Sequence, residues 1–244
     1  MRFLNSFFNE SDLLKKIRTD AESKKIPILS YNSARFLEAL CFVKNPESIL
    51  EIGCGIGYSS YFLIKNFKNL LESEDSILKN SLKILKNNNA NDNIGNSNKN
   101  CLIYTGIDMN KERLKEASFF IERMFPEFNK YKNIKIEFIC SNILKIIDKI
   151  KTFYDMVFID AAKFEYGIYI KSIEKNLKNG SVVIADNIFY SNKIYSKEIS
   201  KHDKNSVNGI KEYLSYIYTN PYFNTALFDI GDGLSVSVYN KFSK

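Results

Sequence analysis

The stretch ILEIGCGIGYSS, residues 49–60, reads as an apolar strand that runs into a glycine-rich turn and then into a helix. Glycines at positions 53, 55 and 57 let the backbone turn sharply and approach a ligand closely. This order predicts the first strand-turn-helix unit of an α/β fold, with a ligand bound at the turn.

The acid before the turn narrows the choice of ligand. The fingerprint for a nicotinamide dinucleotide is GxGxxG, with the pyrophosphate at the helix N-terminus, whereas this turn reads GxGxG and follows Glu51. S-adenosylmethionine carries a cationic sulfonium and an ammonium, which suit Glu51, and Ser59 can hydrogen-bond its carboxylate. The turn therefore favours S-adenosylmethionine, and an NAD-dependent oxidoreductase is the competing class of enzyme.

A second acid follows the next strand-like run, residues 101–108. In nucleotide-binding α/β folds an acid at this place accepts hydrogen bonds from both ribose hydroxyls, and Asp108 occupies it. The alternative is that Asp108 only caps the helix that begins near Asn110. Together with the glycine turn, Asp108 favours a nucleoside cofactor.

The rest of the chain predicts a doubly wound α/β fold with a mostly parallel sheet and helices on both faces, because strand-like runs alternate with amphipathic segments such as residues 111–124. The strand-like runs are residues 48–52, 101–108, 134–140, 154–160 and 181–186. Residues 224–240 hold two further runs around Gly231 and Gly233, which predict two antiparallel strands at the sheet edge.

Two segments lie outside this alternation. Residues 1–46 predict a helical N-terminal extension, in which Ser11 caps a first helix and Pro27 separates it from a second. Residues 66–100 are rich in Asn and too polar to bury much apolar surface, so we expect a surface insertion within a single domain spanning residues 1–244.

Composition and the absence of certain sequence signals indicate the compartment and the kinds of partner to expect. No apolar run approaches the roughly 20 residues that cross a bilayer, no export signal is visible, and the four cysteines have no metal-ligand spacing. A cytoplasmic protein without a membrane partner is expected. The net charge of +7 permits a polyanionic partner without requiring one.

Polar side chains end two strands that we expect to be neighbours. In YDMVFIDAAKFEY, residues 154–166, a buried strand ends on Asp160, and the next strand ends on Asp186 and Asn187. Two carboxylates and an amide oxygen suit Mg²⁺ or Mn²⁺. Lys163 would lie near this cation, where positive charge and burial would lower its pKa and allow it to act as a base. The alternative is that these acids are turn residues and Lys163 a solvated charge.

These motifs, with FIDAAK, VVIADN and GDGLSVS, resemble the catechol and caffeoyl-CoA O-methyltransferase family. The resemblance implies a Rossmann-like methyltransferase fold, a homodimer, Asp160, Asp186 and Asn187 as metal ligands, and Lys163 as the catalytic base. The cofactor positions that it implies are Glu51, Gly53, Gly55, Gly57, Tyr58, Ser59, Asp108, Met109, Asn142 and Asp160. The family often has Gly-Asp where this chain has Ser141 and Asn142, whose carbonyl could still bind the adenine amino group.

The acceptor implied is a hydroxyl with a second oxygen beside it. Catechols fit this description, and so does 5-hydroxyuridine in tRNA, because segments near both termini look like the bacterial branch that methylates it. The loop after Asn187 alternates lysines with Phe189, Tyr190 and Tyr195, which suits an exposed anticodon base, although an ordinary solvated loop explains it as well. His202, the single histidine, has no partner at a suggestive spacing. A cofactor-binding or RNA-binding module without catalysis is the remaining alternative.

Overall fold

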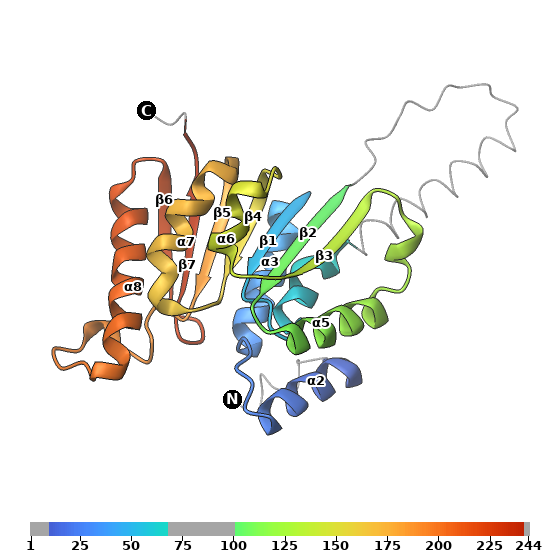
Figure 1. The fold of residues 1–244 in the computed structure, drawn as a ribbon, viewed down its shortest axis with the longest axis horizontal. Coiled ribbons are helices and arrows are strands. Elements are labelled where there is room, and N and C mark those ends of the chain that lie inside the picture. Colours follow the sequence, from blue (N-terminus) through green and yellow to red (C-terminus); the bar gives the residue numbers. More distant parts are fainter. Residues whose placement is uncertain (1–9, 68–100, 242–244) are drawn as a thin grey trace, which may run out of the picture.

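The computed structural model describes residues 10–67 and 101–241, and the greater part of the expected 66–100 insertion lies outside them. Its sheet has seven strands in the order β3-β2-β1-β4-β5-β7-β6 (Figure 1). The strands are β1 (Ser48–Ile52), β2 (Leu102–Asp108), β3 (Ile134–Cys140), β4 (Tyr154–Ile159), β5 (Leu177–Asp186), β6 (Phe223–Phe228) and β7 (Leu234–Tyr239). Strands β1 to β5 pair in parallel, and β7 runs antiparallel to both β5 and β6. The predicted α/β sheet with an antiparallel edge is confirmed.

Helices cover both faces of the sheet (Figure 1). They are α2 (Asp12–Ser23), α3 (Tyr31–Lys44), a helix over residues 58–67, α5 (Lys111–Met124), α6 (Ile143–Ile146), α7 (Tyr166–Ile173) and α8 (Lys201–Thr219). The first four contribute to one apolar core with residues such as Leu37 and Phe120. Helices α6 to α8 contribute to a second core on the opposite face, with residues such as Ile170 and Tyr213.

Local signals in the sequence account for several helix ends. Ser11 caps α2 by accepting a hydrogen bond from the Leu14 N–H, as predicted, and Ser30 caps α3 in the same way. Strand β5 begins at Leu177, four residues earlier than the sequence indicates, because the polar segment 178–180 continues it. Within the part of the chain that the structure describes, no helix has the length and apolarity needed to cross a membrane.

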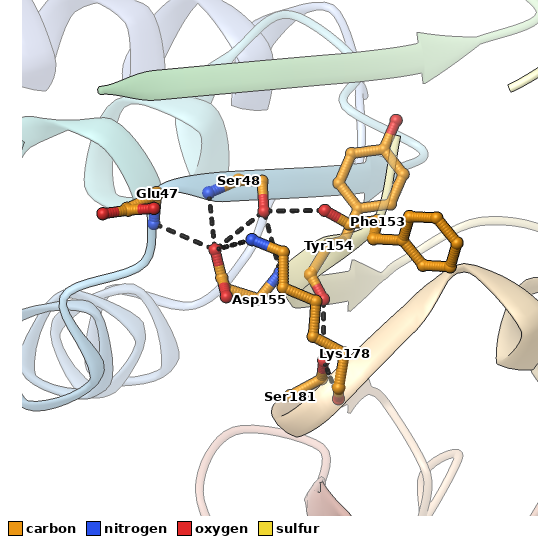
Figure 2. A network of polar contacts seen from close by, with 7 residues as sticks. All are labelled: Glu47, Ser48, Phe153, Tyr154, Asp155, Lys178 and Ser181. Atoms are coloured by element: carbon orange, nitrogen blue, oxygen red, sulfur yellow. Dashed lines mark hydrogen bonds and ion pairs between the residues drawn. The ribbon is translucent and has the colours of Figure 1, made fainter. Parts of the chain in front are cut away.

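A polar network ties the amino ends of β1, β4 and β5 together (Figure 2). One carboxylate oxygen of Asp155 accepts hydrogen bonds from the Ser48 N–H at 3.0 Å and the Ser48 hydroxyl at 2.7 Å, and from Lys178 Nζ at 2.8 Å. The Ser181 hydroxyl donates to the Tyr154 carbonyl at 2.7 Å. The opposite, carboxyl edge of the same strands is left for the candidate site.

Candidate active site

A cavity of about 460 Å³ opens at the carboxyl ends of the parallel strands. This is where ligands bind in open α/β sheets, because the strand order reverses there. Its wall runs from the end of β3, past β2 and β1, to the ends of β4 and β5. The predicted site residues in the wall are Gly53, Gly55, Asp108, Met109, Asn142, Asp160, Lys163, Asp186 and Asn187.

Lys163 and Asp160 form an ion pair at the β4 end of the cavity. Lys163 Nζ lies 2.7 Å from Asp160 Oδ1 and donates a second hydrogen bond to the Tyr166 hydroxyl at 2.8 Å. Burial would lower the Lys163 pKa, but Tyr166 and Asp160 outweigh it and raise the pKa above its ordinary value. The Asp160 carboxylate stabilises the ammonium form. The lowered pKa that the sequence predicts for Lys163 beside a bound cation stays a prediction.

Tyr166 holds this pair in place and was not predicted. Its side chain is fully buried and its hydroxyl is within hydrogen-bonding distance of the Ile159 carbonyl at 3.2 Å and the Asp186 carbonyl at 3.1 Å. It therefore joins the ends of β4 and β5 beneath the lysine. Its place three residues after Lys163 is the signal that could have identified it.

Asp186 and Asn187 complete this end of the cavity. Burial, together with the Asp160 carboxylate, raises the pKa of Asp186 to about 7. Asn187 Oδ1 is buried without a hydrogen-bond partner in the described structure. Buried acceptors of this kind are rare, and an amide oxygen beside two carboxylates fits Mg²⁺ or Mn²⁺. No three His, Cys, Asp or Glu side chains in residues 10–67 and 101–241 are placed so that they could hold a metal ion, so the set that fits depends on Asn187.

Asp108 lies at the other end of the cavity, after β2. Its Oδ2 accepts a hydrogen bond from the Gly55 N–H at 2.9 Å, and its Oδ1 accepts one from the Asn110 N–H at 2.8 Å. The residue that caps α5 is Asn110, whose side chain accepts from Glu112 and Arg113 N–H groups. The reading of Asp108 as a helix cap only is wrong, because this carboxylate links the glycine turn to the end of β2.

The sequence predicted four further cofactor residues, Glu51, Gly57, Tyr58 and Ser59, which are not among the described residues of the cavity wall. Glu51 is fully buried and accepts hydrogen bonds from the hydroxyls of Ser59, Ser60 and Tyr104. Burial raises its pKa, and these three hydrogen bonds oppose that rise. Because side chains alternate along β1, Glu51 shares the face of Ile49 rather than that of Ile52, which lines the cavity. The cofactor role of these four residues stays a prediction.

Gly53 brings the glycine turn into contact with the end of β4. A Cβ atom at Gly53, whose φ is 94°, would lie 2.1 Å from the Asp160 carbonyl oxygen. Only glycine fits such an approach. The glycine turn and the Asp160 backbone therefore pack directly against each other, which fixes the end of β1 relative to the end of β4.

The β3 end of the cavity combines apolar groups with hydrogen-bond donors. Met109 is 68% exposed at its rim, and Ile143 lies in its wall. Asn142 caps α6 through Oδ1, which accepts from the Leu144 N–H at 2.9 Å. Arg113 and Pro27 also line the cavity without having been predicted. Arg113 lies in the first turn of α5, one turn beyond Asp108, which could have indicated it, but no local signal points to Pro27.

The sequence is similar to those of known methyltransferases. The sequence model of the O-methyltransferase family matches residues 102–239. Tapetum-specific methyltransferase 1 of Arabidopsis thaliana is 28% identical over 238 residues, which cover 93% of this chain and 86% of that protein.

Solved structures share the fold. A Staphylococcus aureus protein provisionally assigned as a caffeoyl-CoA O-methyltransferase has a TM-score of 0.71 at 22% identity, with 98% of each chain covered. An O-methyltransferase of Bacillus cereus solved with S-adenosylhomocysteine (SAH) has a TM-score of 0.70 at 18% identity, covering 98% of this chain and 96% of that one. The family match spans more than half of the sequence and takes in Asp108, Asp160 and Asp186, and we conclude that this chain belongs to the O-methyltransferase family.

Proposed function

We propose that this protein transfers the methyl group of S-adenosylmethionine to a hydroxyl oxygen that has a second oxygen beside it, and that it requires Mg²⁺ or Mn²⁺. The observation that carries this proposal is Asn187 Oδ1, a buried acceptor without a partner in the described structure, in the same cavity wall as Asp160 and Asp186. Asp108 and Gly55 at the other end provide the place for the cofactor.

The chain's own residues divide the work between the two ends of the cavity. Asp160, Asp186 and Asn187 would hold the cation, which when bound lowers the pKa of an acceptor hydroxyl and orients the neighbouring oxygen. Asp108 would accept hydrogen bonds from the ribose hydroxyls of the cofactor. Because one cavity holds both reactants, the displacement of the sulfonium methyl becomes effectively intramolecular.

Lys163 would take the hydroxyl proton onto Nζ. It can do so only in its neutral form, whereas its contact with Asp160 holds it protonated. Proton removal by Lys163 therefore requires the Asp160 carboxylate to bind the metal cation rather than the Lys163 ammonium group.

The acceptor that we propose is 5-hydroxyuridine in tRNA, whose hydroxyl lies next to a carbonyl. In the segment that follows Asn187, Tyr195 is 66% exposed, and Lys197, Lys201 and Lys204 are exposed further along the chain. Exposed rings suit stacking with an unpaired base, and lysines suit phosphates. Lys193 contributes less, because it is paired with Asp203 at 3.0 Å. His202 is exposed on the first turn of α8, apart from the cavity wall.

The test is methyl transfer from labelled S-adenosylmethionine to tRNA that carries 5-hydroxyuridine and, separately, to a simple catechol, each with Mg²⁺ and with chelator. Label in tRNA that depends on Mg²⁺ supports the proposal. Label in catechol alone would replace tRNA by a small molecule as acceptor. Cofactor binding without transfer to either substrate would favour the module without catalysis. The homodimer implied by the family resemblance is tested by light scattering.

A further inference from the structure

The turn between β6 and β7, residues 229–233, holds the loop that follows β5. The Ile188 N–H donates to the Gly233 carbonyl at 3.0 Å, and the Phe189 N–H donates to the Asp232 carbonyl at 2.9 Å. The Asp232 carboxylate adds three contacts with Ser191. The Ser191 N–H lies 2.6 Å from Oδ1 and 2.8 Å from Oδ2, and the Ser191 hydroxyl lies 3.4 Å from Oδ2. This side chain therefore fixes the loop two residues beyond its last backbone contact with the turn.

The loop needs such a restraint because its backbone is strained. Tyr190, Ser191 and Asn192 follow one another with φ values of 47°, 51° and 61°, and Asn187 has a φ of 62°. Left-handed conformations bring the Cβ atom too close to the backbone in residues other than glycine. Such residues persist only where the surrounding structure holds them, and they gather at functional sites.

The other side of the loop is held by different contacts. The Tyr190 hydroxyl donates to Asp203 Oδ1 at 3.1 Å, and Lys193 Nζ lies 4.9 Å from the centre of the Tyr190 ring. These contacts restrain the Tyr190 side chain. The Asp232 carboxylate restrains the Ser191 backbone, at the middle of the left-handed run.

Asn187 begins this loop and carries the acceptor on which the candidate cation site depends. We propose that Asp232 is a positioning residue for that site: by holding the left-handed run at Ser191, it fixes the Asn187 backbone and thereby the direction of Oδ1. This inference rests on the proposed function. Asp232 is not one of the described residues that line the cavity, so its restraint on Asn187 acts through the loop.

The experiment measures the binding of Mn²⁺ and of SAH separately. Groups that orient metal ligands contribute 10- to 100-fold to metal affinity, so Asp232→Ala should weaken Mn²⁺ binding, followed by electron paramagnetic resonance, by about that factor. The dissociation constant for SAH, measured by calorimetry, should stay within about twofold. Asp229→Ala is the matched control, because Asp229 is exposed in the same turn.

A second substitution tests whether strain is the cause. Glycine adopts a positive φ without a Cβ clash, so Ser191→Gly in the Asp232→Ala background should recover most of the lost Mn²⁺ affinity. If Asp232→Ala does not fold, Asp232→Asn, which keeps one acceptor oxygen, allows the same comparison with a smaller expected loss.

The outcomes separate this inference from the proposed function. No Mn²⁺ binding by the unmodified protein would overturn both. Unchanged Mn²⁺ binding by Asp232→Ala would overturn this inference alone, as would equal losses for Mn²⁺ and SAH in step with a lower Tm, which would indicate a merely structural residue.

Discussion

Lys163 is the residue on which the proposed chemistry depends most. Its ammonium group contacts Asp160 and the Tyr166 hydroxyl, and its side chain is only 13% exposed. A lysine enclosed in this way has few alternative positions, so its place relative to an acceptor is set by β4 and β5.

Lys163→Met should lower the rate of the chemical step by about 10²-fold or more, since general base catalysis contributes roughly 10²- to 10⁴-fold. Single-turnover methyl transfer measures this rate, and calorimetry should find SAH binding unchanged. Full activity of the methionine variant at neutral pH would exclude Lys163 as an essential base.

To a cofactor base bound at the β3 end of the cavity, Asn142 would present its Nδ2 donor more readily than its amide oxygen. Its Oδ1 already accepts from the Leu144 N–H, so Nδ2 is the atom without a contact among the described residues. The sequence suggested that the carbonyl of Asn142 could bind the adenine amino group, and the helix cap competes with that contact. Arg113, which lies in the same wall, is a donor only.

We therefore expect a weak preference for adenine. The unmodified protein should bind SAH less than about tenfold more tightly than its inosine analogue, in which a carbonyl replaces the amino group. Asn142→Asp keeps an oxygen for the helix cap and gives the base an acceptor, so its preference for SAH should rise. Competition calorimetry measures the dissociation constants for SAH and for the inosine analogue. An unchanged ratio of the two constants in the aspartate variant would show that Asn142 does not contact the base.

The sequence predicts residues of the site well where they follow strand ends. Asp108, Asp160 and Asp186 were placed in this way, because the carboxyl ends of parallel strands meet at one edge. Glu51 lies within a strand, where alternation turns it toward the other face. Pro27 reaches the cavity only through packing of the N-terminal segment, which no local pattern encodes.

Among the elements, helix α8 sets the position of Lys163 through one close contact. A Cβ atom at Gly209 would lie 2.4 Å from the Lys163 carbonyl oxygen and 2.6 Å from the Phe164 Cα. The glycine lets α8 approach the 3₁₀ turn of residues 163–165.

Gly209→Ala should push this turn away from α8 and destabilise the protein by about 1–3 kcal/mol, the usual cost of overpacking. We expect slower methyl transfer at unchanged SAH affinity, because the displaced backbone belongs to Lys163. Urea unfolding and single-turnover assays measure the two effects. Lys211→Ala, an exposed change in the same helix, is the control, and equal behaviour of the two variants would contradict this role for Gly209.

At the amino edge of the sheet, Asp155 contributes stability that depends on pH. Burial would raise its pKa, but hydrogen bonds from Lys178 and Ser48 outweigh this and lower the pKa below its usual value. A carboxyl group with a lowered pKa in the folded state stabilises the protein above its unfolded pKa of about 3.9 and loses this contribution as pH falls through the folded value.

Asp155→Asn should therefore lower the free energy of unfolding by about 2 kcal/mol at pH 7, the scale of hydrogen bonds to a charged group. The difference from the unmodified protein should shrink toward zero as pH falls below 3. Urea unfolding across this pH range measures it. Asp148→Asn, in an exposed ion pair with Lys175, is the control. A difference that does not change with pH would show that the charge of Asp155 is not the cause.

Element types followed from the sequence more readily than their limits. Helix α5 was predicted over its whole length, because its apolar residues recur at helical spacing before Phe125. The start of β5 was missed, because Lys178, Asn179 and Gly180 do not look like strand residues, and only pairing with neighbours extends the strand over them.

In the whole molecule, the cavity crosses the ends of five parallel strands and meets both groups of helices. A ligand bound there contacts residues from most of the sheet and none of these contacts survives unfolding. SAH at about 100 times its dissociation constant should therefore raise the free energy of unfolding by about 2.7 kcal/mol. Thermal unfolding with and without SAH measures this, with adenosine as the control ligand. No change in Tm would contradict cofactor binding to the folded state.

The Asp155 network and the cavity occupy opposite ends of the same strands, and β4 alone separates them by about 20 Å. Sites more than about 7–10 Å apart contribute independently to stability. Folding stability and acceptor choice can therefore be engineered at separate sites of this protein. Variant libraries at the residues of the network can be screened for higher folding stability without a change in acceptor choice. Variant libraries at the residues of the cavity can then be selected for new acceptors in the stabilised protein.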